Sequence, residues 1–176
     1  MIRIALVLLA LSLAATALCG QAPGGGKQAQ NAWAEFFPDG LLDGSGQPAP
    51  LDRLSGKLVG LYFSAHWCPP CRAFTPKLVA FRDKNAAQFE VVFVSSDRSK
   101  ADMQTYIKET NMKWLCVPFK SQSASALQQR FQVQGIPKLI VLSPSGRTIS
   151  ENARADVTNS PASALESWLK AAQAKK

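Results

Sequence analysis

The chain has 176 residues, of which 47% are apolar and 18% are charged, a composition typical of a folded globular protein and not of a disordered one. Its length suits one domain with a full hydrophobic core and is too short for two ordinary domains. The net charge of +8 comes from scattered Lys and Arg residues without a run of five like charges. This scatter indicates a solvated surface, so no nucleic-acid binding is expected.

Residues 1–20 have the pattern of a secretory signal peptide. Arg3 gives a short basic start, residues 4–13 are almost wholly apolar, and small residues follow at 14–17. The apolar run is too short to span a bilayer comfortably and no second one follows, so we expect no membrane span. We therefore expect an exported protein, periplasmic or secreted. Lipid anchoring at Cys19 is an alternative, which Leu18 disfavours because a small residue should precede the lipidated cysteine.

The folded domain is expected to begin after a linker. Residues 21–32 include three consecutive glycines and are predicted to be flexible, and the domain is expected at 33–172. Its first strong element is the apolar stretch 58–64, which predicts a strand buried on both faces. Apolar residues then recur at spacings of three and four, which predicts the buried stripe of a helix: Cys71, Phe74, Leu78 and Phe81.

Further strands and helices alternate after this first pair. A second strong strand is expected at 90–96, and apolar stripes predict helices around 103–110 and 127–131 with a short strand at 114–117 between them. Later elements are a strand at 138–142, a turn at 143–146, a partner strand at 147–149, and a closing helix from Pro161 capped by Ser160. This order predicts an α/β domain of three layers with a mixed sheet.

Cys68 and Cys71 are separated by only two residues. A disulfide between them would close a very small loop and constrain the unfolded chain little, so a purely structural role is disfavoured. A closed zinc site needs about four ligands, and the chain has one histidine, His66, and no second such cysteine pair. We therefore expect no metal and favour a redox couple. Cys116, in an apolar segment, is expected to be an inert buried thiol.

The position of the pair predicts two unequal thiols. Cys68 lies where the predicted helix begins, and Pro69 and Pro70 suit its first turn, where no intrahelical N–H bond is lost. A helix N-terminus carries partial positive charge and free N–H groups, which lower the pKa of a thiol and make it a nucleophile. Cys71 lies one turn further on the buried stripe. We therefore expect an exposed attacking thiol and a sheltered resolving thiol.

The sequence resembles the thioredoxin superfamily, and specifically its tryparedoxin and nucleoredoxin branch. The motifs that carry the resemblance are Tyr-Phe-Ser-Ala at 62–65, Trp-Cys-Pro-Pro-Cys-Arg at 67–72, Phe-Thr-Pro at 74–76, Val-Ser-Ser-Asp at 94–97 and Gly-Ile-Pro at 135–137. It implies a thioredoxin-like three-layer α/β/α sandwich with a mixed central sheet. The stretch between residues 96 and 137 is longer than an ordinary thioredoxin needs, which indicates an extra helix–strand insertion before the cis-proline.

The resemblance also implies roles for individual residues. Cys68 would be the nucleophile, Cys71 the resolving thiol, and Pro137 the cis-proline that faces the disulfide. Substrate contacts would come from Trp67, Pro69, Pro70, Ile136 and Pro137. The thiols would be tuned by His66, Arg72 and Tyr62. Tyr62 occupies the position at which ordinary thioredoxins carry a buried aspartate, so water would accept the proton of Cys71.

The predicted activity is thiol–disulfide exchange, in which Cys68 attacks a substrate disulfide and Cys71 resolves the mixed disulfide. No nucleotide or flavin motif is visible, so no cofactor is expected beyond the cysteine pair, and a thiol electron donor must restore the dithiol. The expected partners are disulfide-containing proteins, and the expected state is a monomer.

Two alternatives stay open. An oxidase would run the same steps in reverse, and a peptide-binding module would keep the fold without turnover. Reduction is favoured because Pro69 and Pro70 offer no N–H to stabilise a Cys68 thiolate, as a strong oxidant would need. The intact pair and Pro137 argue against a module, since binding alone needs no thiols.

Overall fold

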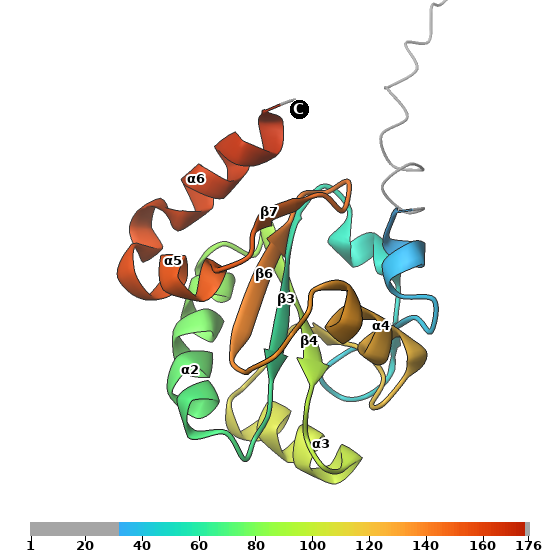
Figure 1. The fold of residues 1–176 in the computed structure, drawn as a ribbon. Coiled ribbons are helices and arrows are strands. Elements are labelled where there is room, and N and C mark those ends of the chain that lie inside the picture. The colour runs from blue at the N-terminus through green and yellow to red at the C-terminus, as the bar shows by residue number, and fades with distance from the viewer. Residues whose placement is uncertain (1–31, 175–176) are drawn as a thin grey trace, which may run out of the picture.

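The computed structural model describes residues 32–174, so the predicted signal peptide, the alternative lipid site at Cys19 and nearly all of the predicted linker lie outside the described residues. The described part holds a seven-stranded sheet between two layers of helices (Figure 1). This is the three-layer α/β arrangement that the sequence predicts. Among the described residues, no helix is long and apolar enough to cross a membrane.

The sheet is mixed, with the strands in the order β2-β1-β5-β4-β3-β6-β7. Its central strand β4 is parallel to both of its neighbours, β3 and β5, whereas the other pairs of neighbours are antiparallel. The strands are β1 Leu41–Leu42, β2 Pro48–Ala49, β3 Leu58–Ser64, β4 Phe89–Ser95, β5 Leu115–Cys116, β6 Lys138–Leu142 and β7 Thr148–Ser150.

The helices cover both faces of this sheet, with α2 and α5 on one side and α4 on the other (Figure 1). The five labelled helices are α2 Pro69–Lys84, α3 Lys100–Glu109, α4 Gln122–Arg130, α5 Ala153–Asn159 and α6 Pro161–Gln173. A 3₁₀ turn, η1, runs over Leu51–Leu54, and residues 32–36 are also helical. The elements α3, β5 and α4 form the helix–strand–helix insertion expected between residues 96 and 137.

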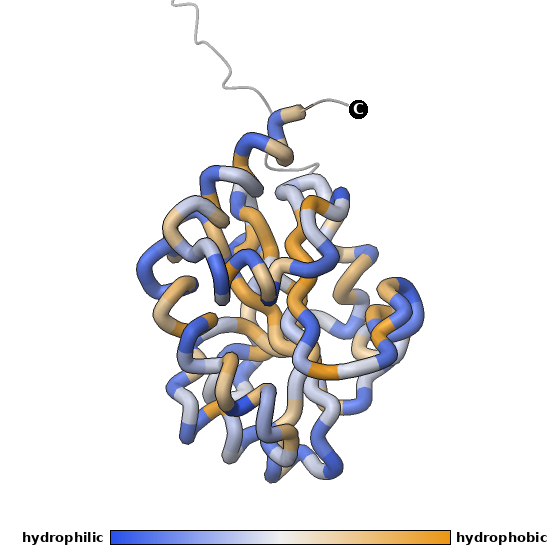
Figure 2. Tube along the Cα trace, turned by 60° about the vertical axis from the view of Figure 1, so that its left-hand side comes forward, coloured by the Kyte–Doolittle hydropathy of each residue, from blue (hydrophilic) through white to orange (hydrophobic). Residues whose placement is uncertain are grey.

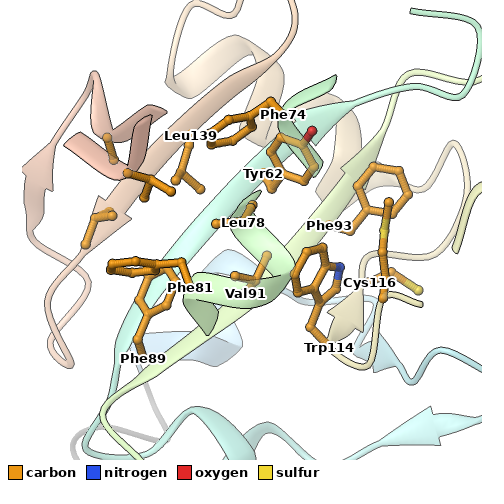
Figure 3. Close-up of a cluster of buried hydrophobic side chains, with 14 of the residues drawn as sticks. Tyr62, Phe74, Leu78, Phe81, Phe89, Val91, Phe93, Trp114, Cys116 and Leu139 are labelled. Carbon is orange, nitrogen blue, oxygen red and sulfur yellow. The ribbon is translucent and has the colours of Figure 1, made fainter. Parts of the chain in front are cut away.

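Side chains alternate across β3, because successive residues of a strand point to opposite faces. Leu58 and Tyr62 join the cluster that packs under α2, α3, α5 and α6, part of which is drawn in Figure 3. Val59, Leu61 and Phe63 join the cluster under α4, η1 and the 32–36 helix. Every residue of β3 is buried, which confirms the expected two-faced strand. The apolar residues accordingly gather along the strands inside the molecule (Figure 2).

Several short elements were not predicted. The hairpin of β1 and β2 has two residues in each strand, and η1 and α5 have four and seven residues. Such segments are too short to show an apolar period. The other elements begin or end within a few residues of their expected positions; the partner strand expected at 147–149, for example, is β7 at Thr148–Ser150.

Strand pairing brings two distant segments of the chain together. The antiparallel register places Phe63, near the end of β3, opposite Lys138, the first residue of β6. The segment that follows β3 therefore lies beside the segment that precedes β6. The first leads through Cys68 into α2, and the second holds Ile136 and Pro137.

Candidate active site

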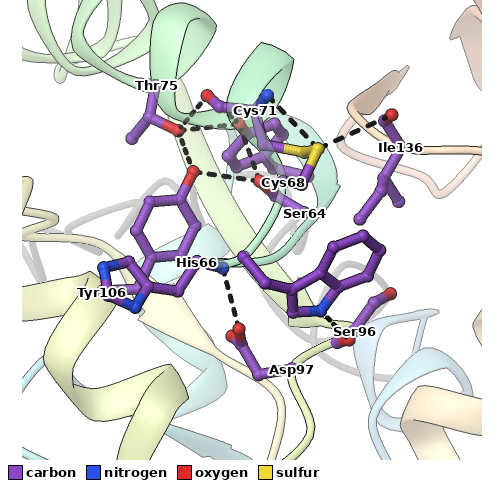
Figure 4. The surroundings of a disulfide bond; sticks show 11 residues. Ser64, His66, Cys68, Cys71, Thr75, Ser96, Asp97, Tyr106 and Ile136 are labelled. Atoms are coloured by element: carbon purple, nitrogen blue, oxygen red, sulfur yellow. Dashed lines mark hydrogen bonds between the residues drawn. A yellow bond between two sulfur atoms is a disulfide. The ribbon is translucent and has the colours of Figure 1, made fainter.

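Cys68 and Cys71 form a disulfide at the start of α2, with their Cα atoms 5.2 Å apart (Figure 4). Cys68 is the N-cap residue of the helix, and its Sγ accepts the N–H of Cys71 at 3.3 Å. Pro69 and Pro70 have no N–H to offer, so the N–H of Cys71 is the first one in this turn that can reach the sulfur. Cys68 thus retains one backbone donor at the positive end of the helix.

The expectation of an exposed Cys68 is wrong for the disulfide form. Cys68 is 3% exposed and Cys71 is 0% exposed, because Ala65 and Ile136 pack around the pair. The two cysteines nevertheless differ in what they face. Cys68 lines a surface groove of about 530 Å³, and Cys71 does not. Access to the disulfide from this groove is therefore through Cys68.

The groove is built from three parts of the chain. These are the turn 67–70, the segment 133–136, and the side chains of Ser96 and Gln128 between them in sequence. Of the expected substrate contacts, Trp67, Pro69, Pro70 and Ile136 line the groove, whereas Pro137 is buried. The lining residues carry no formal charge.

Trp67 is the one large apolar residue that the described part of the chain exposes, at 53%. Its indole N–H donates to the carbonyl oxygen of Ser96 at 3.1 Å, which fixes the ring beside the disulfide. A fixed, half-exposed indole offers apolar contact area at little cost in side-chain entropy. This placement suits the substrate contact that was expected of Trp67.

The Ile136–Pro137 peptide bond is cis, as the resemblance implied. The carbonyl oxygen of Ile136 lies 3.9 Å from Sγ of Cys68, so this segment approaches the disulfide directly (Figure 4). The residues directly before Pro137, 133–136, line the groove. The role of Pro137 in docking a substrate stays a prediction.

Asp97 fastens the loop that precedes Cys68 to the loop that follows β4. Its Oδ1 accepts the N–H of His66 at 2.7 Å, and its Oδ2 accepts the hydroxyl of Ser95 at 2.8 Å. The residue is only 5% exposed, and burial raises the pKa of Asp97 while these hydrogen bonds partly oppose that change. No role was expected for Asp97, although the residue belongs to one of the recognised motifs.

The three residues expected to tune the thiols lie in different surroundings. The Nε2 atom of His66 lies 2.8 Å from Oε2 of Glu109, and its ring packs on Tyr106 with centroids 5.6 Å apart. Arg72 is exposed and forms no ion pair within residues 32–174. Tyr62 is fully buried under the active-site turn. The electrostatic effects of His66 and Arg72 on the cysteines stay predictions.

Tyr62 belongs to a cluster of four buried hydroxyl groups behind the disulfide, which we call the hydroxyl cluster: Tyr62, Ser64, Thr75 and Tyr106. Burial raises the pKa of Tyr62 above its usual value, so its hydroxyl stays neutral. Of these four, only Tyr62 was expected at the site, because Thr75 in α2 and Tyr106 in α3 meet β3 only in the folded chain. The available signals were that Ser64 and Thr75 belong to two of the recognised motifs.

Cys116 lies in β5, is 2% exposed, and has its Sγ 3.8 Å from the carbonyl oxygen of Asp43. Burial raises the pKa of its thiol to about 12, which agrees with the expected burial. Its chemical inertness stays a prediction. Within residues 32–174, no group of three His, Cys, Asp or Glu side chains could hold a metal ion.

Comparison with known proteins agrees with this geometry. The family model described as thioredoxin-like matches residues 56–148, so the chain belongs to the thioredoxin-like family. Within it, the similarity is to the nucleoredoxin and tryparedoxin branch. Nucleoredoxin of Mus musculus is 46% identical over 129 residues, which cover 71% of this chain but only 29% of the mouse protein.

Two solved structures are similar over nearly their whole length. Tryparedoxin II from Crithidia fasciculata is 38% identical with a TM-score of 0.70, and the match covers 77% of this chain and 91% of that one. A thioredoxin from Wuchereria bancrofti is 46% identical with a TM-score of 0.64, covering 74% and 94%. The chain thus spans less than a third of the curated nucleoredoxin and most of these smaller proteins. Its fold and its disulfide-forming cysteine pair are those of the thioredoxin-like family.

Proposed function

We propose that this protein is an exported thiol–disulfide oxidoreductase that reduces disulfides in other proteins. The observation that carries the proposal is the Cys68–Cys71 disulfide at a helix start, with Cys68 facing a groove that residues 133–136 also line, directly before the cis bond to Pro137. A purely structural disulfide would need neither the groove nor the exposed Trp67 beside it.

The exchange begins from the dithiol. The Cys68 thiolate, stabilised by the helix N-terminus and the N–H of Cys71, forms a bond to one sulfur of a substrate disulfide. The other substrate sulfur leaves as a thiolate. Cys71 then loses its proton and bonds to Sγ of Cys68, which releases the second substrate sulfur and leaves the Cys68–Cys71 disulfide. A thiol donor from outside the chain restores the dithiol.

The small number of backbone N–H donors around Sγ of Cys68 supports reduction of the substrate over its oxidation. Two successive prolines leave Sγ of Cys68 with a single backbone N–H at 3.3 Å. Fewer donors stabilise a thiolate less, so the dithiol state is favoured less than in a strong oxidant. A free-energy change of about 1.4 kcal/mol shifts the reduction potential by roughly 30 mV, so the loss of one hydrogen bond to the thiolate changes the potential appreciably.

The substrate class follows from the groove. Its lining combines an indole, prolines and the neutral polar side chains of Ser96 and Gln128, which suits an extended polypeptide better than a charged small molecule. Export is supported by the basic start, apolar run and small residues of positions 1–20. Protein disulfides are the substrates that an exported reductase would meet.

The test is the reduction of insulin by dithiothreitol, with and without the protein. We expect catalysis by the native chain and by Cys116→Ala, whose cysteine does not line the groove, and none by Cys68→Ser. A reduction potential near the thioredoxin value of about −270 mV supports a reductase, whereas one near about −120 mV would make the protein an oxidase. If neither the native chain nor the Cys116→Ala control catalyses insulin reduction, the alternative of a peptide-binding module is favoured.

Export is tested separately. Residues 1–20 fused to a reporter should carry it out of the cytoplasm and be removed, with the cleavage point read by N-terminal sequencing. A reporter that keeps its full N-terminus inside the cell would refute export without touching the exchange chemistry.

A further inference from the structure

The start of α2 lacks one helical backbone hydrogen bond. Pro76 has no N–H, so the carbonyl of Arg72 is left without its helical partner, whereas Pro69 and Pro70 remove only N–H groups that the first turn leaves free. Cys71 lies next to this weakened turn. Bonds from other elements therefore help to hold the turn of Cys71 in place when the disulfide opens.

The hydroxyl cluster bonds to this turn from inside the molecule. The carbonyl oxygen of Cys71 accepts the hydroxyl of Thr75 at 2.9 Å and lies 3.4 Å from the hydroxyl oxygen of Tyr62. The two hydroxyls lie 2.8 Å from each other, and Ser64 donates to Tyr62 at 3.0 Å. Tyr106 lies within hydrogen-bond distance of both Thr75 and Ser64, as Figure 4 shows in part.

One arrangement of protons satisfies the whole cluster. Ser64 donates to Tyr62, Tyr62 to Thr75, Thr75 to the carbonyl of Cys71, and Tyr106 to Ser64 or Thr75. All four side chains are 0% exposed, so an unpaired hydroxyl here would be costly. The chain of bonds has one terminal acceptor, Cys71, and each bond polarises the next.

We propose that the hydroxyl cluster positions Cys71 for the resolving step, with Thr75 as the main positioning residue. None of these bonds involves a sulfur atom, so opening the disulfide removes none of their donors or acceptors. They tie the Cys71 turn to β3 through Tyr62 and to α3 through Tyr106. A thiol held close to the mixed disulfide reacts as if at high concentration, which speeds the resolving attack. This inference rests on the proposed exchange reaction.

The two steps can be timed separately with 5,5′-dithiobis(2-nitrobenzoate) in excess, in a stopped-flow instrument. Attack by Cys68 releases one thionitrobenzoate in a bimolecular phase, and resolution by Cys71 releases the second in a unimolecular phase. We expect Thr75→Val to slow the second phase about tenfold and to leave the first within about twofold, because proximity acts only on the intramolecular step. Thr75→Ser, which keeps the hydroxyl, should restore the native rate.

The equilibrium gives an independent readout. A tenfold loss of effective concentration makes the disulfide tenfold easier to open, which raises the reduction potential of Thr75→Val by about 30 mV. Tyr62→Phe removes the hydroxyl that donates to Thr75 and lies 3.4 Å from the Cys71 carbonyl oxygen, and should act in the same direction, so it serves if Thr75→Val does not fold. Tyr106→Phe, whose hydroxyl does not touch Cys71, should have a smaller effect.

The outcomes separate the two proposals. Equal slowing of both phases, or a native second phase in Thr75→Val and Tyr62→Phe, would overturn the positioning role. Absence of any thionitrobenzoate release from Cys68 in the native chain would instead overturn the exchange reaction itself.

Discussion

Replacing Arg82 by Leu tests how α2 is held to the sheet. Glu90, in β4, is 1% exposed, and its carboxylate accepts two hydrogen bonds from the Arg82 guanidinium, at 2.8 Å and 2.7 Å. These bonds raise the pKa of Arg82, so its guanidinium stays positively charged across the working pH range. Within residues 32–174, Arg82→Leu leaves the buried carboxylate with the N–H of Val91, at 2.9 Å, as its remaining hydrogen-bond donor.

The cost follows from the burial of the partner. Removing one member of a buried, hydrogen-bonded ion pair costs about 3–5 kcal/mol, because the remaining charge is stranded away from water. For a domain of this size, this corresponds to a fall in the thermal midpoint of about 10 °C. Replacing both residues, as Arg82→Leu with Glu90→Leu, should recover most of the loss, since no buried charge is left.

The chain offers a matched control. Lys113 and Asp83 form a pair with an N–O distance of 3.9 Å, and their side chains are 60% and 37% exposed. Lys113→Leu should cost less than about 1 kcal/mol, since water screens an exposed pair. Urea unfolding followed by tryptophan fluorescence gives the free energies of all four proteins. An Arg82→Leu variant no less stable than Lys113→Leu would refute the reasoning.

Two further predictions concern the cysteines. Cys71→Ser should accumulate mixed disulfides with exported proteins through Cys68, and Cys68→Ser far fewer, since only Cys68 lines the groove; equal trapping on non-reducing gels would reverse the assignment of nucleophile and resolver. Cys116 should resist iodoacetamide in the native reduced protein, because a thiol pKa of about 12 keeps the thiolate roughly a thousandfold rarer near pH 7 than the ordinary value of 9.0 does. Its alkylation rate should keep rising with pH above 9, and rapid native labelling at pH 7 would contradict its burial.

The sequence predicted the parts of the fold whose signals are long and regular. The continuous apolar run of β3, the stripe of α2 and the insertion between residues 96 and 137 all lie where expected. The short hairpin strands and α5 carry too few residues for a period to appear.

The site was predictable only where it is local in sequence. The cysteine pair, Trp67 and the helix start follow from adjacent residues, and the cis bond at Pro137 followed from a recognised motif. The burial of Cys68 depends on Ile136, far away in sequence, so the expected exposure was wrong. The hydroxyl cluster joins β3, α2 and α3, and no local pattern records such a meeting.

The two edge strands of the sheet determine how readily another chain can pair with it. One edge of the sheet is the two-residue β2, which includes Pro48, and the other is the three-residue β7, against which α6 packs. Short, proline-bearing or covered edges give an incoming strand few free N–H and C=O groups to pair with. An extended chain is thereby given little opportunity for strand addition and for the aggregation that can follow.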